Sequence, residues 1–378
     1  MWRIPLFKLD YDESEFESVM RVLKSQWLTA GDVTSNFENE FASYLGKGVR
    51  ATAVSSGTAA LHLSLLACGI KRGDEVMVSG LSFVAGINVV EMVGAKSIWV
   101  DCTSHDDWNL SVDDIKKKMT DKVKAIVLVH YAGYPCNMED IMEFARSHGV
   151  HVIEDVAHAV GAEYCGKKCG TIGDIGCFSF FSNKNLSTGE GGMVVTCNDA
   201  LQNKLVLLRS HGMTSLTIER YKKKGFSYDV MFPGLNYRLD EIRSALGRAQ
   251  LNKLDRNNKK RCDLTLYYKK RLMGIGGISV PWKKIQLGVM PSYHIFPVLL
   301  DASKERIRIM EAMREKGIQT SIHYPSYSSF SYYKDYGLQE IEVADDISKR
   351  VLTLPLYPSM ANEEVDEVCR VLKESLEC

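Results

Sequence analysis

The residues best suited to chemistry lie between Gly176 and Thr196, where one lysine, Lys184, occupies a polar turn. Two β-prone runs, Cys177–Phe181 and Met193–Thr196, flank this turn and indicate a strand–turn–strand unit. An amine in such a turn can form a Schiff base with an aldehyde if its pKa falls below the ordinary value of about 10.4. A lone turn lysine is more often a solvated charge, so this stretch alone leaves both interpretations open.

A second group of candidates follows the apolar run Val150–Ile153, which ends in Glu154-Asp155. Asp155 either caps the next helix or keeps a pyridine nitrogen protonated, which makes the ring an electron sink. His158, three residues on, is placed to donate to a phenolic oxygen. Phe83, in a predicted strand–helix loop, is either a core side chain or a ring that stacks on a flat ligand.

A third candidate is an anion site at Ser56, Gly57 and Thr58. The β-prone run Arg50–Ser56 precedes it and the helix-forming run Ala59–Ala67 follows. A helix that begins after a turn of small residues aims free backbone N–H groups and its positive end at an anion. Ordinary capping explains the same residues, and they match neither the P-loop nor the dinucleotide-binding glycine pattern.

Strands and helices alternate through the first part of the chain and must position these candidates. The predicted strands are Arg50–Ser56, Glu75–Ser79, Ser97–Val100, Ala125–His130 and Val150–Ile153, and the predicted helices between them are Ala59–Ala67, Ala85–Val93, Val112–Met119 and Met138–His148. This alternation predicts an α/β fold with a mostly parallel central sheet covered by helices on both faces. Ligands of such sheets bind beyond the carboxyl ends of the strands, which is where the candidates fall.

The remainder of the chain predicts a second, smaller unit. An amphipathic helix over Arg238–Asp255 continues as Arg261–Leu272 toward it. The later predicted elements are strands at Tyr293–Leu300 and Gln319–His323, helices at Lys304–Lys316 and Asn362–Leu376, and a turn-rich segment at Leu352–Pro358. We therefore expect a large ligand-binding domain over residues 1–250 and a small C-terminal α+β domain over residues 251–378.

Composition excludes several classes of function. The chain has 378 residues, with 47 Lys+Arg against 47 Asp+Glu and 45% hydrophobic residues. Zero net charge argues against a nucleic-acid partner. The ten cysteines show no zinc-ligand spacing, so no metal site is expected, and they fit a reducing compartment. No apolar run reaches the roughly 20 residues of a membrane helix, and the polar N-terminus is no signal peptide. A soluble, cytoplasmic protein with no membrane partner is expected.

In combination, several short motifs resemble the DegT/DnrJ/EryC1/StrS family of sugar aminotransferases, a branch of the fold-type I pyridoxal 5′-phosphate (PLP) enzymes. The resemblance runs almost from end to end of the chain. Its motifs are W-L-T-A-G at Trp27–Gly31, S-S-G-T-A-A-L at Ser55–Leu61, E-D-V-A-H-A at Glu154–Ala159, F-S-F-F-S-N-K-N-L-S-T-G-E-G-G at Phe178–Gly192, G-L-N-Y-R-L at Gly234–Leu239, Q-L at Gln250–Leu251, S-Y-H at Ser292–His294 and L-P-L-Y-P at Leu354–Pro358.

This resemblance implies roles for individual residues. Lys184 would form the Schiff base with PLP and Asp155 would pair with its pyridinium nitrogen. His158 would neighbour the cofactor's O3′ and Phe83 would lie over its ring. The phosphate would be bound by Ser56, Gly57, Thr58 and Ser179, and by Asn236 of the neighbouring subunit in a homodimer with shared sites. The substrate contacts would come from Arg238, His323 and Tyr324.

The implied function is amino transfer in two half-reactions, from an amino acid, expected to be L-glutamate, to a keto-sugar that is expected to be nucleotide-linked. Related dehydratases have His in place of the lysine, so Lys184 favours transamination. Three alternatives remain open at this point. They are an aminotransferase for a keto-cyclitol, a regulatory protein that binds PLP or a sugar without turnover, and a nicotinamide-dependent sugar oxidoreductase, which the missing glycine pattern disfavours.

Overall fold

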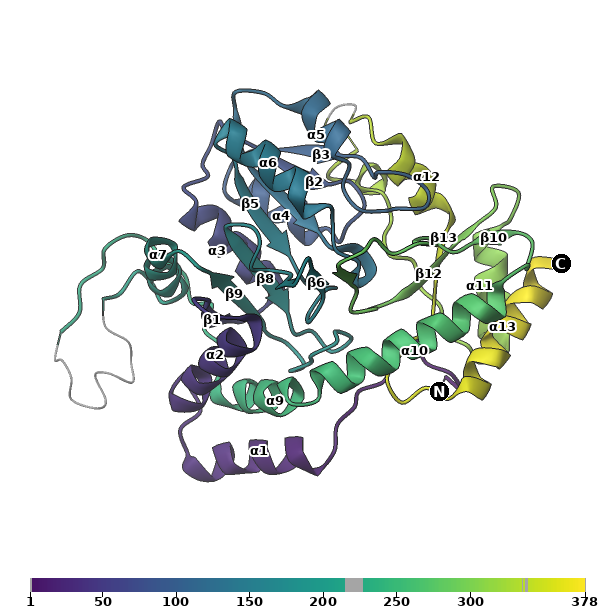
Figure 1. The fold of residues 1–378 in the computed structure, drawn as a ribbon. Helices are drawn as coiled ribbons and strands as arrows, with labels where there is room; N and C mark the ends of the chain where they lie inside the picture. The colour runs from purple at the N-terminus through teal and green to yellow at the C-terminus, as the bar shows by residue number, and fades with distance from the viewer. Residues whose placement is uncertain (1, 215–226, 335, 337–338, 378) are drawn as a thin grey trace.

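The centre of the fold is a seven-stranded sheet with the order β1-β9-β8-β5-β4-β2-β3 (Figure 1). The computed structural model describes residues 2–214, 227–334, 336 and 339–377. The strands of the sheet are β1 Arg50–Val54, β2 Glu75–Ser79, β3 Lys96–Val100, β4 Val123–Val129, β5 His151–Asp155, β8 Ile175–Ser179 and β9 Gly192–Thr196. Within this sheet β9 runs antiparallel to its neighbours β1 and β8, and the other pairs are parallel. The α/β fold with a mostly parallel sheet is confirmed.

Helices cover both faces of the sheet because successive strand residues point to opposite sides. Val76 and Val78 pack with helices α3, α4 and α7 in one hydrophobic cluster. Met77, between them, packs with α5 and α6 on the other face, and α2 covers the β1–β9 end of the sheet. The helices of this layer are α2 Asp32–Leu45, α3 Gly57–Ala67, α4 Ala85–Met92, α5 Val112–Lys118, α6 Met138–His148 and α7 Asp199–Arg209.

The strand directions bring the candidate residues to one edge of the sheet. Since β1 and β8 are both antiparallel to β9, they run the same way as β4 and β5. The carboxyl ends of β1, β4, β5 and β8 therefore meet, and β9 begins at the same edge. Ser56 follows β1, Asp155 ends β5, Ser179 ends β8, and Lys184 lies in the β8–β9 connection.

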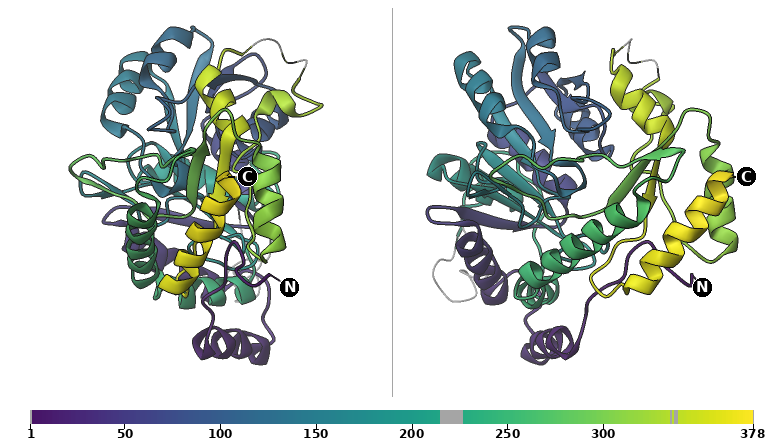
Figure 2. Two further views of the ribbon diagram at one scale, coloured as in Figure 1. Left: turned by 90° about the vertical axis from the view of Figure 1, so that its right-hand side faces the viewer. Right: turned by 45° about the vertical axis from the view of Figure 1, so that its right-hand side comes forward.

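A second layer of structure packs beside this sheet (Figures 1 and 2). It holds a three-stranded sheet, β10-β12-β13, whose side chains share a hydrophobic cluster with helices α10, α11 and α13. The long helix α10 crosses from the large sheet to this part. Helix α9 Glu241–Leu251, just before α10, packs on α1 and α2 beside the large sheet. The later elements are α10 Leu254–Leu272, β10 Ile278–Ser279, β12 Phe296–Leu300, α11 Arg306–Glu315, α12 Glu342–Arg350, β13 Val351–Leu354 and α13 Asn362–Glu377. The domain boundary between residues 250 and 251 stays a prediction.

The smaller elements complete the fold. They are α1 Glu13–Ser25, the short third sheet of β6 Glu163–Tyr164, β7 Lys167–Lys168 and β11 Val289–Met290, and the 3₁₀ turns at Tyr131–Gly133 and Tyr327–Ser329. Before α1, the segment from Arg3 to Leu6 lies against residues 317–319, where Ile4 bridges Ile318. Among the described helices, none is long and apolar enough to cross a membrane.

Two predicted elements are wrong in the C-terminal part. Gln319–His323 forms no named strand; it makes an isolated bridge from Ser321 to Thr353. The strand found in this part is β13, Val351–Leu354, which overlaps the segment Leu352–Pro358 that was predicted as turn-rich. The Ser321–Thr353 bridge lies on the free edge of β13, on the side away from β12, and it is the one pair that Gln319–His323 forms there among the described residues. Helices α7 and α12 were not predicted.

Candidate active site

A cavity of about 410 Å³ opens at the carboxyl edge of the large sheet and gathers most of the predicted site residues. Its wall includes Ser56, Gly57, Thr58, Phe83, Asp155, His158, Ser179, Lys184, His323 and Tyr324. These residues come from six separate stretches of sequence. The first eight belong to the large sheet and its connections, and the last two come from the C-terminal part.

Lys184 lies inside this cavity and is not a solvated surface charge. The turn that carries it is held by a hydrogen bond from its own N–H to the carbonyl of Phe181 at 2.9 Å, and by Ser182 Oγ, which donates to Gly189 O at 3.1 Å. Burial lowers the pKa of the Lys184 amine from 10.5 to about 8, and the negative charge of Asp155 partly opposes this shift. At neutral pH roughly a tenth of the amine is therefore unprotonated, far more than for an exposed lysine.

Asp155 caps no helix, because turns lead from β5 to β6, and its predicted contact with a ring nitrogen stays a prediction. Its Oδ1 accepts a hydrogen bond from the N–H of Ala157 at 2.9 Å, within the turn that follows β5. The same side chain lines the cavity. Burial raises the pKa of Asp155, while the Ala157 hydrogen bond and the nearby Lys184 act in the opposite direction. A cationic ligand group in the cavity would stabilise its charged form.

His158 is held in one tautomer by two contacts. Its Nδ1 accepts from the N–H of Ala132 at 3.3 Å, and its Nε2 lies 2.7 Å from Tyr324 Oη. Burial, with a further effect of Lys184, holds the pKa of His158 well below its usual range, so the ring is neutral. Because Nδ1 accepts, the single ring proton is on Nε2, which donates to Tyr324.

The beginning of α3 and the end of β8 form a cradle for an anion. Ser56 is the N-cap of α3 and its side chain accepts from Ala59 N at 3.1 Å, so ordinary capping accounts for that hydroxyl. Gly57 lets the helix approach Ser179, since a Cβ at position 57 would stand 2.8 Å from Ser179 Cβ. The first-turn N–H groups and the hydroxyls of Thr58 and Ser179 together suit a phosphate.

The rim of the cavity is partly apolar. Phe83 is 55% exposed, so it is not the core side chain that its sequence position also allows. Its ring centroid lies 5.6 Å from that of Tyr324. His323 Nδ1 lies 3.0 Å from Thr353 Oγ1, and burial lowers the pKa of His323 to about 3, with a smaller contribution from Lys184.

Asn236 and Arg238 do not line this cavity within the described chain. They belong to a segment that runs beside β1 and the end of α7, with Asn236 bridging Ser210 and Arg238 bridging Val54. Tyr237, between them, accepts from Ser55 N at 2.8 Å through its carbonyl. Their predicted role in a neighbouring subunit's site is therefore not contradicted by their position, and it stays a prediction.

Sequence reasoning gave no site role to several residues that line the cavity. They are Leu61, Ser82, Ala85, Val129, Ala157, Phe181, Asn183 and Glu190. Asn183 and Glu190 flank the predicted lysine turn, so their position in the motif is the signal that was available. Phe181 belongs to the same motif, and the remaining residues are separated from that turn in sequence and join it through the fold.

The residues of the cavity fit PLP on the basis of their chemistry. A half-buried lysine with a lowered pKa is the amine that an aldehyde requires. A carboxylate shares its cavity, and the close approach that Gly57 permits at Ser179 leaves backbone N–H groups for a phosphate.

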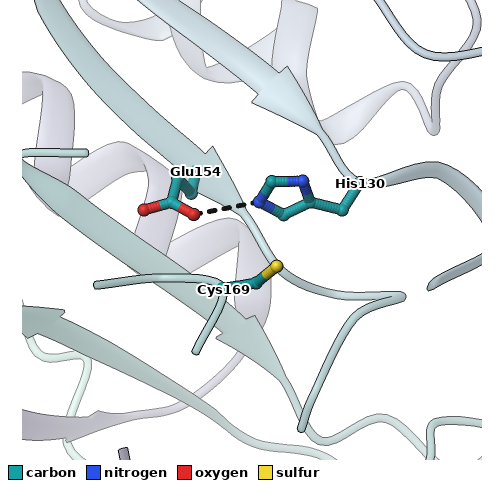
Figure 3. A group of neighbouring side chains, drawn as sticks. All are labelled: His130, Glu154 and Cys169. Atoms are coloured by element: carbon teal, nitrogen blue, oxygen red, sulfur yellow. Dashed lines mark hydrogen bonds and ion pairs between the residues drawn. The ribbon is translucent and has the colours of Figure 1, made fainter. Parts of the chain in front are cut away.

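A second buried cluster, His130, Glu154 and Cys169, contains groups that bind metals elsewhere, and its ligand atoms lie within 4.8 Å of one another (Figure 3). Glu154 Oε2 accepts from His130 Nε2 at 3.0 Å and from Gly170 N at 2.7 Å. Its Oε1 accepts from Ile172 N at 2.8 Å and Gly173 N at 2.6 Å.

The other two side chains of this cluster each carry a proton. His130 Nδ1 accepts from Cys136 N at 3.0 Å, so its proton lies on Nε2, toward Glu154. Burial, reinforced by the Glu154 charge, raises the pKa of the Cys169 thiol well above its usual range. The cluster is therefore a closed hydrogen-bonded support, with a proton on the nitrogen that would face a metal.

Comparison with known proteins identifies the family. A model of the DegT/DnrJ/EryC1/StrS aminotransferase family matches residues 9–373. GDP-perosamine synthase of Escherichia coli O157:H7 is 38% identical over 373 residues, which cover 98% of this chain and 98% of that protein. The structure of DesV from S. venezuelae has a TM-score of 0.90 at 31% identity and covers 100% of both chains.

Spr1654 of Streptococcus pneumoniae, solved in a PLP form, has a TM-score of 0.89 at 26% identity and covers 100% of this chain and 98% of that one. These matches extend over the cavity, both sheets and the segments that connect them. The chain belongs to the DegT/DnrJ/EryC1/StrS aminotransferase family.

Proposed function

We propose that this protein, a PLP-dependent aminotransferase by its family, moves the amino group of L-glutamate to the ketone of a nucleotide-linked sugar. The observation that carries the proposal is a half-buried lysine with a lowered pKa that shares one cavity with a carboxylate. Its likeness to GDP-perosamine synthase over 98% of both chains supports the sugar substrate. The nucleotide link of the sugar, L-glutamate as the amino donor and the homodimer are all parts of this proposal.

Lys184 is the group that moves protons. PLP, when bound, supplies an aldehyde for a Schiff base and a ring that withdraws electrons from the carbon being deprotonated. The Lys184 amine would take the proton from the donor's α-carbon and later give it back, so that it would act first as a base and then as an acid. A pKa near 8 suits both steps, because the amine accepts and releases protons near neutral pH.

Asp155 and His158 hold the cofactor's polar atoms. The Asp155 carboxylate would bind the protonated ring nitrogen, and its burial strengthens that ion pair. His158, with its proton fixed on Nε2, presents a donor to the side of the cavity where Tyr324 lies. Glu190, His323 and Tyr324 supply the polar contacts that a sugar's hydroxyl groups require.

The active unit that we propose is a homodimer in which Asn236 and Arg238 complete the partner's site. Two features support it. Asn236 and Arg238 lie outside the cavity of their own subunit. Large apolar side chains are exposed at the cavity rim and in the segment before residue 234, namely Phe83, Phe181, Tyr228, Val230 and Met231. Exposed apolar side chains of this size commonly mark protein interfaces, and most closed oligomers are twofold.

A substrate panel tests the proposed reaction. Purified protein with PLP and L-glutamate is offered GDP-, UDP- and TDP-linked keto-sugars and a free keto-cyclitol, and 2-oxoglutarate is measured. We expect glutamate-dependent amination of a nucleotide-linked keto-sugar. Amination of the cyclitol alone would replace the substrate class, and a cofactor absorbance that glutamate leaves unchanged would contradict transamination from this donor.

Subunit complementation tests the shared site. Lys184→Ala is mixed with an Asn236→Ala, Arg238→Ala double variant under conditions in which subunits exchange. In the mixed dimer one site carries all the substitutions and the other carries none, so activity should reappear. The shared-site proposal fails if mixed dimers form, as seen by native mass spectrometry, and remain inactive.

A further inference from the structure

The S-Y-H motif at Ser292–His294 lies directly behind the lysine turn, and the proposed reaction gives it no role. Its backbone pairs with the 3₁₀ turn before α6: Ser292 N donates to Gly133 O at 3.0 Å and His294 N to Ala132 O at 2.9 Å. Ser292 Oγ donates to His158 O at 3.0 Å. The motif therefore joins the C-terminal part to the residues around the cavity.

His294 holds one neighbour of Lys184 directly. Asn185 Nδ2 donates to Ser292 O and to Asn258 Oδ1, both at 2.9 Å, which assigns Asn185 Oδ1 as an acceptor. His294 Nδ1, 2.9 Å from that oxygen, must then carry the ring proton. Burial, with the nearby His158 and Lys184, holds the pKa of His294 well below its usual range. The ring is neutral, and its Nε2 is a bare acceptor.

The other neighbour of Lys184 presents a matching acceptor. Among the described residues, neither His294 Nε2 nor Asn183 Oδ1 has a hydrogen-bond partner, and both atoms are buried. Both side chains line one small cavity with room for about a single water molecule, about 10 Å³, whose other walls are mostly apolar. A water molecule in this space can donate one hydrogen bond to each of these two acceptors.

We propose that His294 is a positioning residue that fixes Lys184 by holding both of its neighbours, Asn185 directly and Asn183 through one bound water. One imidazole then determines the position of the residues before and after the reactive lysine. The proposal rests on the proposed function in one respect, namely that Lys184 reacts with the cofactor. The substrate sugar plays no part in it.

The test uses the holoenzyme and the glutamate half-reaction, followed by the absorbance of bound cofactor. His294→Phe removes both contacts, whereas His294→Asn keeps a donor near the position of Nδ1 and loses the acceptor at Nε2. Val368→Ala, a core truncation in α13, is the control for general destabilisation. We expect His294→Phe to slow the half-reaction about 100-fold, which is the effect of a small misplacement of a reacting group. The rate of His294→Asn should fall between those of the wild type and His294→Phe.

A second readout separates positioning from general damage to the fold. His294→Phe should also shift the pH midpoint of the cofactor absorbance, which reports the Lys184 nitrogen. Val368→Ala should lower the melting temperature and leave both the midpoint and the half-reaction unchanged. A folded His294→Phe enzyme with wild-type rate and midpoint would overturn the proposal, whatever the keto-sugar panel gives.

A double-mutant cycle tests the water bridge and does not depend on His294→Phe folding. Asn183→Ala and His294→Asn each remove one acceptor from the same water, so the double variant should be little slower than the slower single variant. A crystal structure should show a water about 3 Å from both His294 Nε2 and Asn183 Oδ1. Additive effects, or density that places no water there, would overturn the bridge.

Discussion

Two carboxylates that are neighbours on β5, Glu154 and Asp155, point into different surroundings. Glu154 points into the His130–Glu154–Cys169 cluster, where both of its oxygens accept two hydrogen bonds each. Asp155 points toward the cavity and accepts a backbone hydrogen bond from Ala157. Both are buried. The comparison teaches that the number of committed lone pairs, and not burial, separates a structural carboxylate from one available for chemistry.

The largest expected effect that bears on this comparison is a loss of turnover when the Lys184 amine, which shares the cavity with Asp155, is removed. Lys184→Ala should lower turnover by several orders of magnitude, since general acid–base catalysis alone contributes roughly 10²–10⁴-fold. The fold should persist, because the turn is held by its own backbone bonds. Steady-state kinetics and circular dichroism measure the two quantities. Near-wild-type turnover would exclude Lys184 from the reaction.

The next largest effect should be a loss of stability when Glu154 is replaced. Glu154→Leu leaves His130 and the N–H groups of Gly170, Ile172 and Gly173 without their acceptor. We expect the free energy of unfolding to fall by about 3–5 kcal/mol, as for other buried charged networks that lose one partner. Urea unfolding measures it. A loss below 1 kcal/mol, about the cost of one ordinary hydrogen bond, would contradict the supporting role.

Asp155→Asn should show the reverse pattern. An amide cannot stabilise a positive ring nitrogen as a carboxylate does, so we expect PLP still to bind while transamination slows roughly 10²–10³-fold. The urea midpoint should change little, because the amide oxygen can still accept from Ala157. Full activity across the pH range would mean that Asp155 only holds the turn after β5.

The smallest effect concerns pH and the cofactor-free protein. The pKa of Lys184 is about 8 in the folded chain and 10.5 without burial. Between these values the unfolded chain binds more protons, so wild-type stability rises with pH in that window. Lys184→Met lacks this titration, so it should be more stable than wild type by roughly 1–3 kcal/mol below pH 8, and its advantage should shrink toward pH 10.5. A constant difference in urea unfolding would show that burial does not depress this pKa.

Much of the large sheet could be predicted from the sequence because its strands are short apolar runs that alternate with helices. The strands near Glu75–Ser79 and Ala125–His130 are found where the pattern places them, and β9 is found at Gly192–Thr196. The antiparallel direction of β9 was not predicted. The strand Val351–Leu354 was missed because Pro355 and Pro358 make its surroundings look like a turn.

The cavity was predicted better than its supports. Asp155 ends a strand and Lys184 and Ser56–Thr58 follow strands, and parallel strands bring their carboxyl ends together. The roles of Glu154 and His294 depend on contacts that sequence does not reveal: Glu154 meets Gly173 across a loop, and His294 meets Asn185 from 109 residues away. Asn185 and His294 both belong to motifs that the sequence shows, but only the structure shows that their side chains form a hydrogen bond.

The assembly of the cavity from distant stretches has a consequence for how the protein acquires activity. Its wall runs from Ser56 near one end of the chain to Tyr324 near the other. Contacts of such long sequence separation form late in folding, since the intervening chain must first be ordered. A nascent chain that has been synthesised only as far as Lys184 therefore contains the reactive amine but lacks His323 and Tyr324, which form part of the cavity wall. Catalytic competence should arise once, at the end of folding, and a proteolytic nick that releases the C-terminal part should abolish it.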